Sequence, residues 1–482
     1  MHFFDTSMTS PDILVQARSG RAWILCLALL TGSLEGISQE TDFSPFARFG
    51  LGTSQGTLTP ALASMGGVTS VSTGHMAVNA DQPASSAGVV NPTFQGSVHF
   101  QGIRLTEGDR SAQTATGGPG SFGLVIKRPR RPRAFQLGLT PLTSKAFNVS
   151  RSLTDSTLGN INETYEGQGG LARAYVGLSR GWRGRGWRSA GKEDSVLVNT
   201  WGLDAGIQAD HWFGDAIQNA FLDIEDATFR DVRTSISSRH RASGVVFGAE
   251  GYTMLRVNYN DSKDFEGSWM LKLGGTWSPA RTLSTDFTHL VQSTVLFNGI
   301  VSGLDTSSFE SAILKGEVPQ QWTMGGGIQW DGPSGGRFGV FVDHHAQAWS
   351  SSQKSLDHLM EGSSEWNDAS STAIGLMVTP KRKSGNPTRS TWRFGFRQST
   401  LPTAILDGDE SSHALTEQRV SMGLNMPLKG SRSASQLHFG MDFGTRSTTL
   451  TAVHAESTLR LHVGVTLTPT AKNLWLIPRL YD

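Results

Sequence analysis

The stretch TLRLHVGVTL, residues 458–467, alternates apolar and polar side chains along its whole length. Leu459 and Leu461 fall on one side, and Arg460 and His462 fall on the other. A period of two predicts a β-strand with one apolar and one polar face. The fold depends on what the apolar face contacts, which is either a second sheet or lipid.

The same alternation recurs through the chain. It is clearest in residues 172–178, 269–277, 337–343 and 436–443. Further strands are predicted over 94–105, 121–128, 134–148, 195–213, 240–258, 322–331, 371–379, 391–398 and 415–426. The total is about fourteen strands, which is within the even numbers that closed membrane barrels use.

The composition suits a barrel better than a packed globular core. Hydrophobic residues make up 37% of the 482 residues, and 56 residues are glycine. A closed barrel needs apolar side chains on one face only, because its interior can be polar. The formal net charge of +1 gives no reason to expect nucleic acid as a partner.

Residues 1–39 are predicted to be a cleaved secretory signal peptide. The apolar run AWILCLALL, residues 22–30, follows Arg18 and Arg21 and precedes small and polar residues. The run is too short to span a bilayer as a helix. Cleavage near Ser38–Gln39 would remove Cys26, the only cysteine, so disulfides cannot hold the mature chain together.

The connections between the strands differ in length. Three are short (127–133, 331–337 and 427–435), and three are long and polar (106–120, 214–239 and 280–320). Short turns at one end and long loops at the other are typical of an outer-membrane barrel. Strand pattern alone also fits a soluble sandwich or a secreted adhesin, but signal peptide, glycine content, loop asymmetry and strand number together favour the barrel.

The order of several motifs resembles a known family. These motifs include NADQPASSAGVVNP (79–92), LGLTPLTSKAFNV (137–149), WGLDAGIQADHWFG (201–214) and VFVDHHAQAW (340–349). The chain is similar to outer-membrane transport barrels of the FadL/TodX type, and more specifically to a divergent, uncharacterised branch of them. The resemblance implies an all-β, transmembrane, antiparallel barrel of about 14 strands, with an N-terminal segment plugging the lumen.

The plug, or hatch, is predicted over residues 40–93, and the barrel over 94–482. In transport members the hatch carries an Asn-Pro-Ala motif, which Asn91 and Pro92 match and from which Thr93 departs. Pro92 restricts the backbone, and with Gly66 and Gly67 it predicts a compact irregular segment. These four residues, Gly66, Gly67, Asn91 and Pro92, are the predicted gating residues. An ordinary loop leading into the first strand remains the alternative.

No residue pattern points to catalysis, a cofactor or a metal. In VDHHAQ the adjacent His344 and His345 point to opposite faces of a strand, so they do not readily share one ion. The acidic run in 221–231 suits a solvated loop, with binding of Ca²⁺ or lipopolysaccharide as the other interpretation. The tryptophans expected near strand ends, as interfacial girdles, are Trp182, Trp187, Trp201, Trp212, Trp277, Trp330, Trp349 and Trp475.

Two functions follow from the sequence. The first is a passive transporter in the bacterial outer membrane for hydrophobic small molecules such as long-chain fatty acids, with no enzymatic activity. The second is a structural or docking barrel that binds a protein partner, for example in a secretion system, without transport. The expected surroundings are the lipid bilayer and lipopolysaccharide, with a hydrophobic ligand or detergent in the lumen and a protein partner at the long outer loops.

Overall fold

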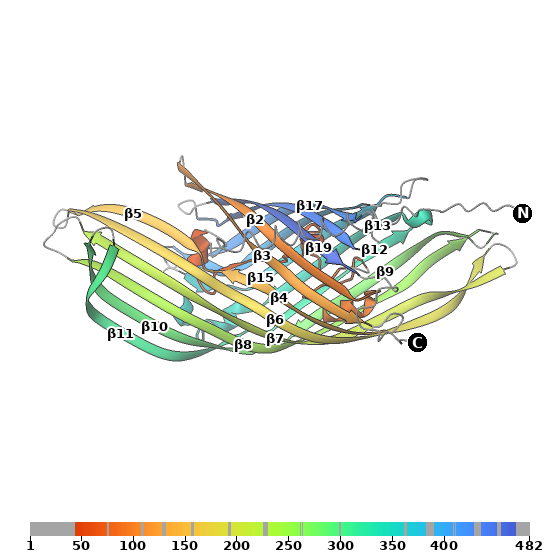
Figure 1. Cartoon of the computed structure of the whole chain (residues 1–482), viewed down its shortest axis with the longest axis horizontal. Coiled ribbons are helices and arrows are strands. Elements are labelled where there is room, and N and C mark those ends of the chain that lie inside the picture. Colours follow the sequence, from red (N-terminus) through yellow and green to blue (C-terminus); the bar gives the residue numbers. More distant parts are fainter. Residues whose placement is uncertain are drawn as a thin grey trace, which may run out of the picture. The chain divides into compact units, whose positions relative to one another are not determined.

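The computed structural model describes residues 44–468 except 75–76, 108–109, 128–131, 156–158, 191–193, 225–229, 261, 263, 298–299, 361–363, 382–389, 408, 410, 429–434 and 451–454 (Figure 1). The predicted signal peptide, with Cys26, lies outside the described residues, as does Trp475. None of the helices in the described ranges has the length and apolar character needed to cross a membrane.

Fourteen strands of the described residues form a closed antiparallel ring. In ring order they are β2 (Thr93–Glu107), β3 (Arg110–Lys127), β4 (Arg133–Ser144), β6 (Gly159–Ala190), β7 (Asp194–Ile224), β8 (Asp231–Tyr259), β9 (Phe265–Ser278), β12 (Gln321–Asp331), β13 (Arg337–Gln347), β15 (Ala369–Thr379), β16 (Thr391–Leu406), β17 (Ser412–Pro427), β18 (Gln436–Ser447) and β19 (Ala455–Leu467). The ring closes where β19 pairs with β2, as in Leu461↔Phe100. The predicted fold class and strand number are confirmed.

The apolar faces of the strands point outward and the polar faces point inward. In the opening stretch, Leu461 is 45% exposed whereas its neighbour His462 is 1% exposed. Phe439 and Phe443 on β18 are exposed in the same way, and Asp442 between them is buried. This is the reverse of a soluble sandwich, and it answers the question raised by residues 458–467: their apolar face is turned toward lipid.

Aromatic residues mark both borders of the lipid-facing band. On β9, Trp269 and Trp277 are both exposed and lie eight residues apart. At about 3.3 Å per residue the separation is about 26 Å along the strand, close to the height of the apolar band of such barrels. The prediction is wrong for Trp212 and Trp349. Trp212 lies inside beneath Arg281, and Trp349 is buried against Trp366 with ring centroids 4.7 Å apart.

The connections alternate between two ends of the ring because neighbouring strands are antiparallel. At one end they contain β5 (Phe147–Asp155), the hairpin of β10 (Arg281–Phe297) and β11 (Ile300–Val318), and β14 (Ser364–Trp366). We call this the outer end and the opposite end, with the predicted short turns, the inner end. Long connections face outward from the cell in such barrels, and short turns face the periplasm.

The three long polar segments do lie at the outer end, but the prediction that they are loops is wrong. Residues 106–120 form parts of β2 and β3, residues 214–239 parts of β7 and β8, and residues 280–320 mostly β10 and β11. Beyond the membrane neither face of a strand must be apolar, so the alternation that signals a strand disappears although the backbone pairing continues. Most of residues 427–435 lies outside the described residues.

A cation in the middle of the lipid-facing band should destabilise the barrel. Leu273 is 61% exposed and lies midway between Trp269 and Trp277. We expect Leu273→Arg to lower the free energy of unfolding in lipid by about 2–4 kcal/mol, because the guanidinium would be placed near the bilayer midplane. Urea unfolding in vesicles, followed by unheated gel mobility, measures this change. Ser308→Arg, at an exposed site on β11, is the control and should leave stability unchanged.

Candidate functional site in the lumen

Residues 44–92, which we call the inner segment, run through the ring from the outer to the inner end. They contain η1 (Pro45–Arg48), β1 (Thr53–Ser54), α2 (Pro60–Ala63) and η2 (Pro83–Gly88). Near the outer end Ser54 pairs with Thr143 of β4, and near the inner end the Lys127 ammonium donates to the Val89 carbonyl at 2.6 Å. Between these points the segment bonds to strands on all sides, so it lies inside the ring.

Two buried carboxylates hold the middle of the inner segment. Asp343 of β13 accepts hydrogen bonds from the backbone N–H groups of Thr69 at 2.5 Å and Ser70 at 2.8 Å. Glu250 of β8 accepts from the N–H of Ser72 at 2.7 Å and from its hydroxyl at 2.6 Å. We call this pair the carboxylate clamp. The clamp accepts hydrogen bonds from backbone N–H groups that have no partner in a helix or sheet. Irregular backbone is tolerated at membrane depth only where the protein supplies such partners.

Gln82 ties the same stretch to the wall from the other side. Its amide nitrogen donates to the carbonyl of Ser70 at 2.8 Å, and to those of Gly275 at 3.1 Å and Ala249 at 3.3 Å. Asp81 of the inner segment forms an ion pair with Arg173 of β6 at 2.6 Å. The inner segment is therefore held by several separate hydrogen bonds and an ion pair.

The predicted gating residues occupy two separate places. Gly66 and Gly67 have φ values of +71° and +81°, in the left-handed region that favours glycine. The Gly66 N–H donates to the Ser421 hydroxyl of β17 at 2.9 Å. Asn91 and Pro92 instead lie at the inner end, where the segment joins β2, and the Asn91 carbonyl accepts from the Thr93 hydroxyl at 2.9 Å.

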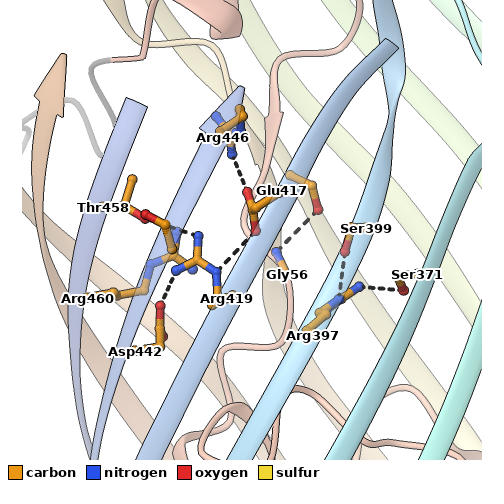
Figure 2. A network of polar contacts seen from close by, with 12 residues as sticks. Gly56, Ser371, Arg397, Ser399, Glu417, Arg419, Asp442, Arg446, Thr458 and Arg460 are labelled. Atoms are coloured by element: carbon orange, nitrogen blue, oxygen red, sulfur yellow. Dashed lines mark hydrogen bonds and ion pairs between the residues drawn. The ribbon is translucent and has the colours of Figure 1, made fainter. Parts of the chain in front are cut away.

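Buried ions of alternating sign line one wall of the lumen (Figure 2). Glu417 lies between Arg419 at 3.1 Å and Arg446 at 2.9 Å, and Arg419 also bonds to Asp442. His462 contacts the other oxygen of Asp442 at 2.6 Å. The strands β17, β18 and β19 supply these groups from their inward faces. Sequence analysis placed such residues in the lumen but did not predict which of them pair, because pairing depends on strand register.

Arg397 of β16 differs from the other arginines of this wall. Its guanidinium donates to the hydroxyls of Ser371 at 3.0 Å and Ser399 at 3.2 Å (Figure 2). Among the described residues no carboxylate lies within ion-pairing distance of it. It lines a cavity of about 320 Å³ that the inner segment and the strands enclose together. Arg397 is thus a cation that faces the cavity and forms no direct ion pair among the described residues.

The cavity is amphipathic. Its charged lining includes five arginines and five carboxylates, listed as Arg173, Arg281, Arg397, Arg419, Arg460, Asp81, Asp210, Asp343, Glu417 and Asp442. Toward the outer end it is lined by Leu51, Leu171, Trp349 and Trp366, which belong to one apolar cluster. A molecule with an apolar body and an anionic group would match both parts of this lining.

The remaining motifs stay outside the lumen site, apart from Asp343 and His345, which both line the cavity. The Nδ1 atom of His344 lies 3.0 Å from the Thr372 hydroxyl on the exposed side of β13, whereas Asp343 points inward. In the acidic run, Asp231 accepts from the Ile224 N–H at 3.2 Å, and Glu225 and Asp226 lie outside the described residues. Among the residues that the structure describes, no group of three His, Cys, Asp or Glu side chains is placed to hold a metal.

Comparison with known proteins places the chain in a family. The BamG family matches residues 21–482, nearly the whole chain. The chain belongs to the BamG family. The search of curated protein sequences finds no match.

Solved structures similar to this BamG-family barrel include two toluene transporters and a FadL homologue. The Pseudomonas putida toluene transporter TodX is 13% identical, with 87% of this chain and 99% of that chain covered and a TM-score of 0.49. The Ralstonia pickettii toluene transporter TbuX is 12% identical, with 86% and 99% covered and a TM-score of 0.47. A Pseudomonas aeruginosa FadL homologue is 12% identical, with 87% and 99% covered and a TM-score of 0.47. The BamG match over nearly the whole chain and the closed ring with outward apolar faces identify the protein as a bacterial outer-membrane β-barrel.

Two glycines of the inner segment give a matched test of its packing. A Cβ at Gly66 would meet the Phe396 carbonyl oxygen at 2.8 Å, whereas a Cβ at Gly56 would meet no atom within 4 Å. Both residues have positive φ, so alanine costs about 1–2 kcal/mol of backbone strain at either position. We expect Gly66→Ala, but not Gly56→Ala, to expose residues 60–72 to protease in the folded barrel. Equal protection in both variants would contradict this packing.

Proposed function

We propose that the protein is a passive outer-membrane transporter for hydrophobic small molecules such as long-chain fatty acids, and that the inner segment is its hatch. TodX and TbuX are toluene transporters. For this chain the proposal rests on its own lumen, and the carboxylate clamp is the observation that carries it. The clamp consists of hydrogen bonds alone, so a movement of residues 69–72 needs no covalent change.

The inner segment also forms part of the cavity wall. Gly66, Gly67 and Thr69 line the cavity, and Asp343 of the clamp lines it as well. A ligand that enters the cavity therefore contacts the atoms that hold the hatch. A ligand can shift the equilibrium between a closed and an open hatch only if it binds the two states with different affinity. Contact with the clamp is one source of that difference.

The lining supports a ligand with one anionic group. The apolar residues Leu51, Trp349 and Trp366 suit an acyl chain, and Arg397 supplies a cation whose only described partners are serine hydroxyls. A carboxylate at Arg397 would form a charge-assisted pair, which is about twice as strong as a neutral hydrogen bond. The proposed ligand would thus place its carboxylate at Arg397 and its chain toward the outer end.

Weakening the clamp should open the hatch. Asp343→Asn keeps one oxygen acceptor for the Thr69 and Ser70 N–H groups but removes its negative charge, so each hydrogen bond falls from about 1.5–3 kcal/mol to about 0.5–1.5 kcal/mol. We expect the variant barrel to stay folded and to conduct ions in planar bilayers more often than wild type. Asp286→Asn, which changes a partly exposed carboxylate paired with Arg241 at 3.4 Å, is the control and should conduct like wild type.

Removing the unpaired cation should reduce uptake of acids selectively. We expect Arg397→Gln to lower uptake of a long-chain fatty acid by about tenfold, because one charged hydrogen bond of about 1.5–3 kcal/mol is lost. Uptake of the matching uncharged alcohol should change little, and Arg397→Lys should restore part of the acid uptake. Equal loss for acid and alcohol would show that Arg397 acts on the fold instead of the ligand.

A docking barrel without transport is the second candidate. The buried ion pairs favour it, since Arg281–Asp210 at 2.9 Å and Arg419–Asp442 tie nearby strands of the wall together. Deletion of residues 60–93 separates the two functions. A folded deletion variant with unchanged permeability to ions and fatty acid would favour docking, whereas raised permeability supports the hatch.

A further inference from the structure

Two arginines meet on the outward face of the barrel at its inner end. Arg133 is the first residue of β4 and is the direct ladder partner of Arg180 on β6. Both side chains are exposed, and they share the outward face with Phe135 and Leu178, which pair two positions nearer the middle of the membrane. Directly opposite residues have Cβ atoms about 4.5–5.5 Å apart. The two side chains therefore leave the wall side by side, and we call them the arginine pair.

The arginine pair lies at the level of the lipid headgroups. Trp182, two positions beyond Arg180 on β6, is 41% exposed, and the Arg180 guanidinium carbon lies 5.4 Å from the centre of its ring. Tryptophan rings at a membrane interface sit at the headgroup level. On the other side of Arg180, Leu178 is 60% exposed and belongs to the lipid-facing band. Arginine covers apolar surface with its stem and extends its charge to the interface, so both charges reach the phosphate layer.

The charge of the arginine pair is not neutralised by an ion pair within the protein. Among the described residues, no carboxylate lies within ion-pairing distance of either guanidinium. Two other outward-facing arginines, at the outer end, do have such partners: Arg239 pairs with Asp215 at 2.8 Å and Arg241 with Asp286 at 3.4 Å. Like charges directly opposite each other destabilise a sheet. An anion bound between the two guanidinium groups would offset that repulsion.

The surroundings of the arginine pair indicate that lipid supplies this anion. On β7 the residue paired with Arg180 is Ala205, which carries no charge. The carboxylate of the next residue, Asp204, is buried and already pairs with Arg183 at 2.7 Å. The outward face of the same strands contacts acyl chains immediately toward the middle of the membrane. The anion that lies beside such a face at headgroup level is a phospholipid phosphate.

We propose that the arginine pair binds the phosphate of an anionic phospholipid in the periplasmic leaflet. The planar guanidinium presents a fork of N–H donors that matches two phosphate oxygens, so two neighbouring forks can hold one phosphate from both sides. The acyl chains of the bound lipid lie along Phe135 and Leu178. This inference goes beyond the proposed transport and does not depend on it, because none of these residues lines the lumen cavity.

Quenching of Trp182 by brominated lipid tests the proposal. The full mature chain is placed in phosphatidylcholine nanodiscs that contain, as a minor component, phosphatidylglycerol or phosphatidylcholine with brominated acyl chains. The Trp182 signal is the difference between each protein and the same protein with Trp182→Phe. We expect phosphatidylglycerol to associate about tenfold more strongly than phosphatidylcholine, because two arginines attract its net charge. The preference should disappear in Arg133→Gln/Arg180→Gln. Equal quenching in wild type, or an unchanged preference in this variant, overturns the proposal.

Two controls separate a lipid site from a general effect of charge. Arg104 and Arg151 are exposed arginines on β2 and β5 at the outer end. Arg104→Gln/Arg151→Gln removes the same charge and should keep the preference of wild type. Inorganic phosphate added to the wild-type nanodiscs should leave the Trp182 quenching unchanged, because the lipid is concentrated at the site by its acyl chains. Loss of the preference in the control variant, or displacement of the lipid by inorganic phosphate, overturns a lipid site.

A stability measurement excludes a role in folding alone. In zwitterionic detergent without anionic lipid, Arg133→Gln/Arg180→Gln should unfold at the same urea concentration as wild type or at a higher one, because it relieves the repulsion between like charges. Added phosphatidylglycerol should raise the midpoint of wild type more than that of the variant, since a ligand stabilises the folded state that binds it. A lower midpoint of the variant in detergent alone, or equal stabilisation of both proteins, contradicts the proposal.

Discussion

A chain inside hydrocarbon must satisfy every backbone N–H and C=O within the protein, because no water is present to bond with them. The fourteen strands meet this condition by closing the ring at β19 and β2, which leaves no edge in the membrane. Everything else follows from the closed ring. Apolar side chains must face lipid, and the polar faces are forced into one lumen. That lumen then determines what else the chain can place there.

The inner segment meets the same condition in a different way. It has almost no regular structure, so its donors and acceptors need partners from the wall. The wall residues Asp343 and Glu250 accept from its N–H groups, and Lys127 donates to the carbonyl of Val89. Within the segment, Gln82 donates to the carbonyl of Ser70. The bonds that make the segment tolerable at membrane depth are also the bonds that a ligand or a mutation would have to break. If the inner segment acts as the proposed hatch, its stability and its gating depend on the same atoms.

The two ends of the barrel differ in how far their strands and connections extend beyond the membrane. At the outer end β5 and the β10–β11 hairpin extend the wall, with charged pairs such as Arg239–Asp215 on its surface. At the inner end most connections are short, and the β6–β7 hairpin extends past them. That extension carries Trp187 and Leu197, which are both exposed.

The period-two pattern by itself determined the ring strands, their outward faces and their number, because lipid requires apolar side chains at alternate positions. The sequence also predicted a compact irregular segment at Gly66 and Gly67, because glycine is favoured where φ is positive. Where that requirement ended, as in β10 and β11, the pattern vanished and strands were mistaken for loops. Only the tertiary structure decided that Asp343 and Glu250 clamp residues 69–72. Those contacts join residues hundreds of positions apart, and they depend on a register that closure of the whole ring sets.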